Sequence, residues 1–153
     1  MTTHVDVRPG YHAHLEEEHG TIATYLVPLA RALFSAVFII FAAGLHFSPA
    51  GVAYAESQGV PLASIVVPLS GVMAVVGGLS VALGFHAKGG AWLLVLFLLP
   101  VTLMMHRFWT VTDPAMAQIQ QAMFLKNLSM LGGALLIAYF GAGPASMDAS
   151  RRA

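Results

Sequence analysis

Residues 61–85 read PLASIVVPLSGVMAVVGGLSVALGF and contain no Asp, Glu, Lys or Arg. A helix of about 20 apolar residues crosses the hydrocarbon core of a bilayer, so this stretch predicts a transmembrane helix. Small residues recur in it at every fourth position, namely Ser70, Ala74, Gly78 and Ala82. This spacing places them on one helix face, where they allow a neighbouring helix to approach closely.

The rest of the chain has the composition of a membrane protein. Of its 153 residues 58% are hydrophobic and only 9% are charged, whereas a soluble domain has about 25% charged residues. The predicted fold is an all-α integral membrane four-helix bundle over residues 21–144, with a short interfacial segment between helices 1 and 2. The four spans are expected at about residues 21–47, 61–85, 91–108 and 117–140.

The termini and the basic residues predict the orientation of the bundle. Residues 1–20 contain an acidic run and several histidines, which is typical of a polar tail and not of a secretory signal, and residues 145–153 form a short C-terminal tail. Lys and Arg near helix ends are retained on the cytoplasmic side. Four of them fall on one side and only Arg107 on the other, so we expect both termini in the cytoplasm and a multi-pass protein of the inner membrane. The four are Arg8, Lys88, Arg151 and Arg152.

Composition and motifs exclude several classes of function. Seven basic and seven acidic residues balance, which argues against a nucleic-acid partner. The absence of cysteine excludes disulfides, thiol redox chemistry and thiolate metal sites. No phosphate-binding loop, nucleophile elbow or pair of catalytic carboxylates is present. Catalytic residues are therefore unknown, and we expect an accessory membrane subunit rather than an enzyme by itself.

The few ionisable residues within or beside the spans are the candidates for a ligand site. A charge inside the bilayer core is costly unless it finds a partner, and Lys126 lies well inside the fourth span. On the predicted topology the other candidates lie in the same half of the membrane, so a cluster that binds a ligand is one hypothesis. The alternatives are structural pairing for Lys126 and interfacial anchoring for the residues that end the third span. The candidate set is Lys126, His106, Arg107, Trp109, His46 and Asn127.

Two further groups of polar residues lie apart from this cluster. Arg31 is near the inner end of the first span, about 22 Å along the helix from His46, and is predicted to be a structural anchor that snorkels to the headgroups. Histidine with carboxylates can bind metals, but the spacing in residues 1–20 matches no defined site. We therefore expect no metal; the weak candidates are His12, His14 and His19.

Short motifs occur in a defined order over residues 25–148. They are Leu29-Ala30-Arg31, Ala43-Gly44-Leu45-His46-Phe47, Gly59-Val60-Pro61, Gly77-Gly78, Gly84, His106-Arg107-Phe108-Trp109, Phe124-Leu125-Lys126-Asn127, Gly132-Gly133, Gly143-Pro144 and Ser146-Met147-Asp148. In this order they resemble the DoxX family of small four-helix membrane proteins. The sequence departs from that family at Ala74, where many members carry a glutamate, and at His46, where many carry a lysine. The first departure argues against a mechanism that needs a carboxylate in the second helix.

The resemblance implies association with membrane redox systems, since the relative DoxD resembles a subunit of a thiosulfate:quinone oxidoreductase. The first functional hypothesis is therefore a membrane subunit of a respiratory or oxidative-stress complex that contributes to a quinone or anion site, with a soluble or membrane redox enzyme as its partner. The second is a non-catalytic scaffold that recruits a soluble partner through residues 1–20. The third is a small-solute or ion pathway, which needs a homo-oligomer around an axis. Membrane lipid is a partner in all three.

Overall fold

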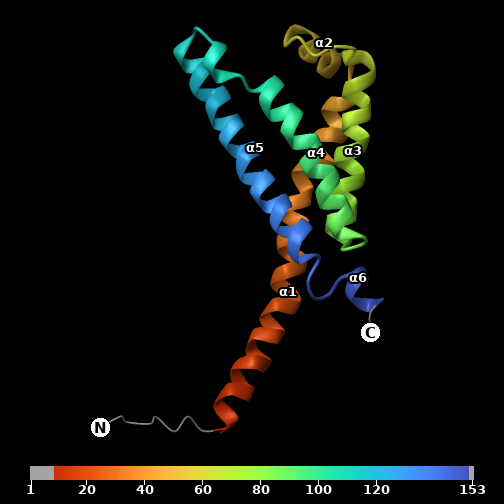
Figure 1. Ribbon diagram of the computed structural model, residues 1–153, viewed down its shortest axis with the longest axis vertical. Coiled ribbons are helices and arrows are strands. Elements are labelled where there is room, and N and C mark those ends of the chain that lie inside the picture. Colours follow the sequence, from red (N-terminus) through yellow and green to blue (C-terminus); the bar gives the residue numbers. More distant parts are fainter. Residues whose placement is uncertain (1–8, 152–153) are drawn as a thin grey trace, which may run out of the picture.

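The computed structural model describes the backbone of residues 9–151 and the side chains from Ile22 to Arg151. Over these residues the chain is helical and contains no strand, which confirms the predicted all-α membrane bundle (Figure 1). The elements are α1 (Pro9–Phe41), the π-helix η1 (Ala42–His46), α2 (Pro49–Ser57), α3 (Ala63–Leu83), α4 (Ala87–Met105), the 3-10 turn η2 (Phe108–Thr110), α5 (Pro114–Phe140) and α6 (Met147–Ser150).

Within the described residues, four segments are long and apolar enough to cross a membrane. They are Ile22–His46, Ala63–Leu83, Ala87–Thr110 and Pro114–Phe140. The first helix begins earlier than predicted, because α1 starts at Pro9 and projects beyond the rest of the bundle (Figure 1). The fourth begins at Pro114, since Asp113 accepts a hydrogen bond from the Met116 N–H at 2.8 Å and caps α5.

Among the four long helices, α1 packs on α3, α3 on α4, and α4 on α5, and the Phe34 ring of α1 also reaches α5 at Gly133. Two adjacent glycines bring α3 close to both of its neighbours. A Cβ added to Gly77 would lie 2.9 Å from the Gly90 carbonyl oxygen, and one added to Gly78 would lie 3.0 Å from the Ile39 side chain. Gly77 therefore faces α4 and Gly78 faces α1, and each permits contact at backbone distance.

The predicted small-residue face of α3 is only partly buried. Ala74 and Gly78 are buried, whereas Ser70 and Ala82 are half-buried. The buried face also includes Gly71, Gly77 and Val81. Since α3 packs between two helices, its buried surface is wider than a single stripe of every fourth residue.

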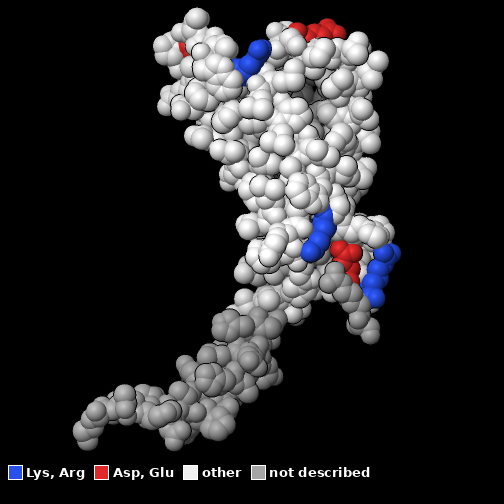
Figure 2. Space-filling model, in the orientation of Figure 1, with Lys and Arg blue, Asp and Glu red and all other residues white. Residues whose placement is uncertain are grey.

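The described bundle exposes much of its apolar surface, as expected for helices in lipid. Leu94 and Leu98 of α4 are fully buried, but Leu96 of the same helix is 57% exposed. On the face shown in Figure 2, acidic and basic side chains lie near the two ends, and the band between them carries none. Lipid tails are as apolar as leucine, so these helices associate through close packing and hydrogen bonds.

The segment after α5 folds back onto the bundle and is held by Arg31. The Arg31 side chain is 5% exposed, and its Nη1 and Nη2 donate to the carbonyl oxygens of Ala142 and Ala145 at 2.8 and 2.7 Å. These carbonyls lie beyond the end of α5, where the helix offers them no donor. Arg31 thus differs from the snorkelling side chain expected from the sequence: it is buried in the protein, because the planar guanidinium can reach two carbonyls at once.

Asp148 joins the same segment to the turn between α3 and α4. Its carboxylate accepts hydrogen bonds from the backbone N–H groups of His86 and Ala87 at 2.8 and 3.0 Å, and its own N–H donates to the Gly84 carbonyl at 2.8 Å. A carboxylate at a helix N-terminus satisfies free donors and interacts favourably with the helix dipole. This cap explains why α4 begins at Ala87, although the sequence indicated a turn that continues to Gly90.

The Arg31 contacts predict a large loss of stability on substitution. In Arg31→Met, two carbonyls lose their donors inside the protein, so we expect the free energy of unfolding to fall by about 3 kcal/mol. Arg107→Met is the matched control, because Arg107 is exposed and donates to one carbonyl, that of Gln58; its loss should cost about 1 kcal/mol or less. Titration with a denaturing detergent measures both values, and equal losses would contradict the assigned role of Arg31.

Candidate functional site

A cavity of about 300 Å³ lies inside the bundle at the end that carries α2. Its volume is at the lower limit of sites that hold small molecules, about 300–1,000 Å³. Towards α6, the Phe34 ring on α1 lies against Gly133 of α5, where an added Cβ would be 2.9 Å from the ring. Towards α2, α5 leans away from α3 (Figure 1). The cavity thus occupies the wider end of a bundle that is narrow at Phe34.

The cavity walls are mainly apolar and reach the surface of the bundle. Phe41 and Leu45 line it and are 64% and 47% exposed, so one side of the cavity opens at the lipid-facing surface of α1 and η1. Unbranched, polarisable methionine side chains adapt to differently shaped ligands. Four of them line the cavity, namely Met104, Met105, Met123 and Met130.

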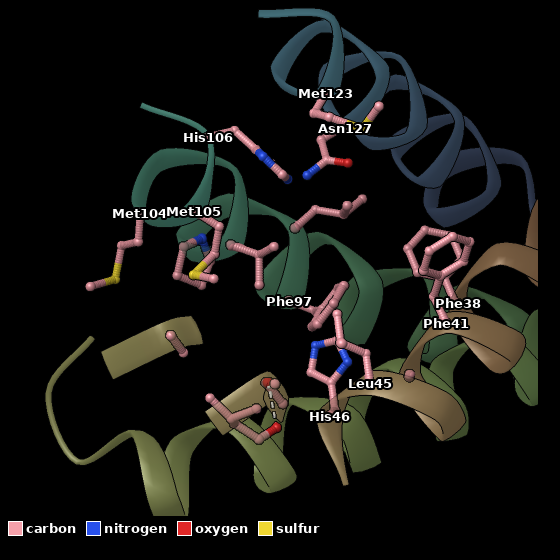
Figure 3. A pocket seen from close by; sticks show the side chains of 18 of the residues that line it. Phe38, Phe41, Leu45, His46, Phe97, Met104, Met105, His106, Met123 and Asn127 are labelled. Atoms are coloured by element: carbon pink, nitrogen blue, oxygen red, sulfur yellow. Dashed lines mark hydrogen bonds between the residues drawn. The ribbon is translucent and has the colours of Figure 1, made fainter. Parts of the chain in front are cut away.

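The π-helix η1 positions His46 at the cavity. π-helical turns are rare and often occur at functional sites. The His46 ring packs on Phe97 with 5.5 Å between ring centroids (Figure 3). Its Nδ1 is inaccessible to solvent and has no partner in hydrogen-bond geometry among the residues that the structure describes. Gly71 of α3 makes room for this turn, because an added Cβ would lie 2.5 Å from the His46 Cβ.

His106 follows α4 and is connected to α5 and α2 by hydrogen bonds. Its Nδ1 lies 2.8 Å from Oε1 of Gln120, and Nε2 of Gln120 donates to the Tyr54 hydroxyl at 3.4 Å. The bond to Gln120 occupies Nδ1 of the imidazole, so Nε2 is the ring nitrogen left for a molecule in the cavity. Gln120 and Tyr54 therefore orient the His106 ring at the cavity wall.

Asn127 is a buried polar residue that lines the cavity. It is 4% exposed, and its side-chain amide makes no hydrogen bond within the described residues. In Figure 3 the Asn127 side chain and the His106 ring point towards one another. A buried amide without a partner costs about 1–3 kcal/mol, and a bound molecule can supply the missing partner.

Lys126 precedes Asn127 on α5 and also lines the cavity, although its side chain is exposed overall. It lies about 18 Å along the helix from Pro114, so it is far from both ends of the 27-residue α5. Among the described residues it has no hydrogen bond or ion pair, and no Asp or Glu lines the cavity.

The remaining two candidates of the predicted ligand set do not line the cavity. Arg107 donates through Nη2 to the Gln58 carbonyl oxygen at 2.6 Å and so ties the α4–α5 connection to the end of α2. Trp109 is 56% exposed and packs on Phe124 with 5.9 Å between ring centroids. The structure thus brings His46, His106, Lys126 and Asn127 together and leaves Arg107 and Trp109 outside.

The described side chains include no group of three His, Asp or Glu residues that could hold a metal ion. The weak metal candidates His12, His14 and His19 lie outside the residues whose side chains are described. The prediction about a metal in this tail is therefore untested.

Two residues at the cavity end, Tyr54 and Gln120, were missing from the candidate set. Tyr54 comes from α2, and only the fold brings that helix over the cavity. Gln120 carries a signal in the sequence, because residues three, seven and ten positions further along α5 share one helix face with it. Those residues are Met123, Asn127 and Met130, all of which line the cavity.

Comparison with known proteins identifies the family. Residues 53–153 match the SURF4 family. The chain is 30% identical to the inner membrane protein YphA of Escherichia coli strain K12 over 132 residues, which cover 86% of this chain and 94% of YphA. It is 32% identical to the inner membrane protein YqjF of the same strain over 123 residues, covering 80% and 88% of the two chains. No solved structure gave a significant match.

The chain belongs to the SURF4 family, and with four apolar helices it is a multi-pass protein of the inner membrane. The DoxX resemblance inferred from short motifs is wrong, because the family model that matches residues 53–153 is that of the SURF4 family. Glycine pairs such as Gly77-Gly78 serve close packing between membrane helices in general. Motifs of this kind therefore do not distinguish one family of helical membrane proteins from another.

The contact between Gly71 and His46 predicts a sharp difference between two glycine substitutions. Gly71→Ala should destabilise the protein by about 1–3 kcal/mol, since a methyl group would collide with the His46 Cβ. Gly132→Ala is the control, because nothing lies within 4 Å of the added Cβ, and the better helix propensity of alanine should stabilise α5 by about 0.5–1 kcal/mol. The midpoints of detergent-induced unfolding compare the two, and a neutral Gly71→Ala would contradict the described packing of η1.

Proposed function

We propose that this protein binds a small amphiphile within the inner membrane, with the apolar part of the ligand in the cavity and a hydrogen-bond acceptor at its polar end. The observation that carries the proposal is the Asn127 amide, which is 4% exposed, faces the cavity and lacks a hydrogen-bond partner within the described residues. Buried polar groups are nearly always satisfied. A ligand head group is the simplest partner for this amide.

The surroundings of Asn127 support an acceptor as the head group of the ligand. Asn127 offers an NH₂ group and Lys126 an ammonium group, and both of these groups are hydrogen-bond donors. The carbonyl of a quinone and the oxygens of an anion both accept such hydrogen bonds. Phe97 and the methionines provide an apolar wall, and the opening at Phe41 and Leu45 gives access from the lipid.

This proposal keeps part of the first hypothesis drawn from the sequence. A quinone or an anion remains a class of ligand, but membership of a redox complex was implied only by the DoxX resemblance and is withdrawn with it. A pathway through a single protomer is disfavoured, since the Phe34 ring against Gly133 narrows the bundle below the cavity. If both termini are cytoplasmic, as the basic residues predict, the cavity lies in the outer half of the membrane.

Replacement of Asn127 by the isosteric leucine tests the proposal. Asn127→Leu removes a buried amide without a partner, so we expect the ligand-free protein to become more stable by about 1 kcal/mol. The same variant should lose ligand binding. Two probes represent the two head-group classes: dodecanoate for an anion, and ubiquinone-1 for a neutral carbonyl. At least one of them should raise the melting temperature of the wild-type protein in neutral detergent, and neither should raise that of Asn127→Leu.

Ser35→Ala is the matched control for this experiment. Within the described residues the Ser35 Oγ is fully buried and has no hydrogen-bond partner, but Ser35 does not line the cavity. Its replacement should leave the probe-induced rise in melting temperature unchanged. If neither probe affects the wild-type protein, or if Asn127→Leu responds as the wild type does, the proposed function is wrong.

A further inference from the structure

We infer that the head group of the ligand is anionic and that Lys126 is its counter-charge. This inference rests on the proposed function and specifies the class of ligand: a single-chain amphiphile that carries a carboxylate or a phosphate. Three steps lead to it, namely the depth of Lys126, the distribution of acidic residues and the donors that surround the cavity.

The first step concerns the position of Lys126 along α5. The residue lies about 18 Å from the start of the helix at Pro114, in a segment apolar enough to span the membrane. A lysine in the interior of a membrane is costly unless it meets a partner or reaches the interface. Lysine side chains on an α-helix lean towards its N-terminus, which here is the end that carries α2 and His106. The ammonium group therefore lies on the side of Lys126 that faces the end with α2 and His106.

The second step is that the described residues supply no anion to this ammonium group. The acidic residues with described side chains are Glu56 on α2, Asp113 and Asp148. Asp113 caps α5, and Asp148 caps α4 at the opposite end of the bundle. None of the three lines the cavity, and Lys126 forms no ion pair within the described residues. A ligand can provide the charge that these residues do not.

The third step distinguishes an anion from a neutral acceptor. A quinone carbonyl would satisfy the Asn127 amide but would leave the charge of Lys126 uncompensated. A carboxylate or phosphate accepts several hydrogen bonds at once and neutralises the charge, and hydrogen bonds between ionised groups are about twice as strong as neutral ones. Lys126 and Asn127, which both carry donors, line one cavity in which no described carboxylate competes. Charge complementarity therefore favours an anionic head group, with its chain directed through the opening at Phe41 and Leu45.

Three probes of equal chain length test this inference: dodecanoate, dodecyl phosphate and the neutral dodecanol. Their binding to the full chain in bilayer nanodiscs of zwitterionic phosphatidylcholine is measured against empty nanodiscs. We expect the wild-type protein to bind at least one of the two anions about tenfold or more tightly than dodecanol. Lys126→Met should abolish that preference while dodecanol binding stays unchanged, and Lys126→Arg should retain the preference.

Lys88→Met is the matched control, because Lys88 is an exposed lysine at the start of α4 that does not line the cavity. This variant should retain the full preference for the anion.

The comparison of anion with alcohol binding in the wild-type protein tests the inference even if Lys126→Met fails to fold. Equal binding of all three probes, or an anion preference that survives in a folded Lys126→Met, overturns the inference and leaves the proposed function standing. Binding of none of the probes overturns the inference, and it overturns the proposed function as well if ubiquinone-1 also fails to raise the melting temperature of the wild-type protein. The two anions show whether a carboxylate or a phosphate is preferred.

Discussion

In the hydrocarbon of a bilayer no water satisfies a polar group, so each polar side chain of a span needs a partner in the protein or in a ligand. This constraint gives the two ends of the bundle different characters. Near α6, Arg31 donates to two carbonyls and Asp148 accepts from two N–H groups. Near α2, Asn127 and Lys126 line a cavity and have no partner within the described residues. One end is closed by its own polar contacts, and the other is open to a further molecule.

The size of the side chains between the helices explains why the bundle is closed near α6 and open near α2. Gly77 and Gly78 bring α3 against α4 and α1, and Gly133 receives the Phe34 ring from α1. Towards α2 the facing residues are longer, and methionines occupy positions where glycine and alanine would permit direct helix contact. The π-helical turn at the end of α1 adds to the effect, since it changes the direction of the side chains just where His46 reaches the cavity. Shape and polarity thus change together along the bundle.

The sequence predicted the spans well, because runs without charge are a direct consequence of the lipid environment. It also placed His46, His106, Lys126 and Asn127 in one half of the membrane, since helix length alone fixes their depth. The burial of Arg31 could not be predicted from the sequence, because its acceptors are 111 and 114 residues away in the chain. The π-helical turn and the bond between His106 and Gln120 were likewise missed, because both depend on how neighbouring helices pack. Short glycine-containing motifs gave the wrong family for a related reason: they report helix packing and not ancestry.

The cap that Asp148 places on α4 has a consequence for the order in which the chain can mature. His86 has a positive φ of 47°, a conformation that costs a residue other than glycine about 1–2 kcal/mol. The N–H groups of His86 and Ala87 find their acceptor 61 or more residues later in the chain. Ribosomes add about 5–20 residues per second, so the start of α4 waits several seconds for its cap after it has entered the membrane. A chain that stops short of Asp148 would leave these two N–H groups without their side-chain acceptor and the strained turn without its cap.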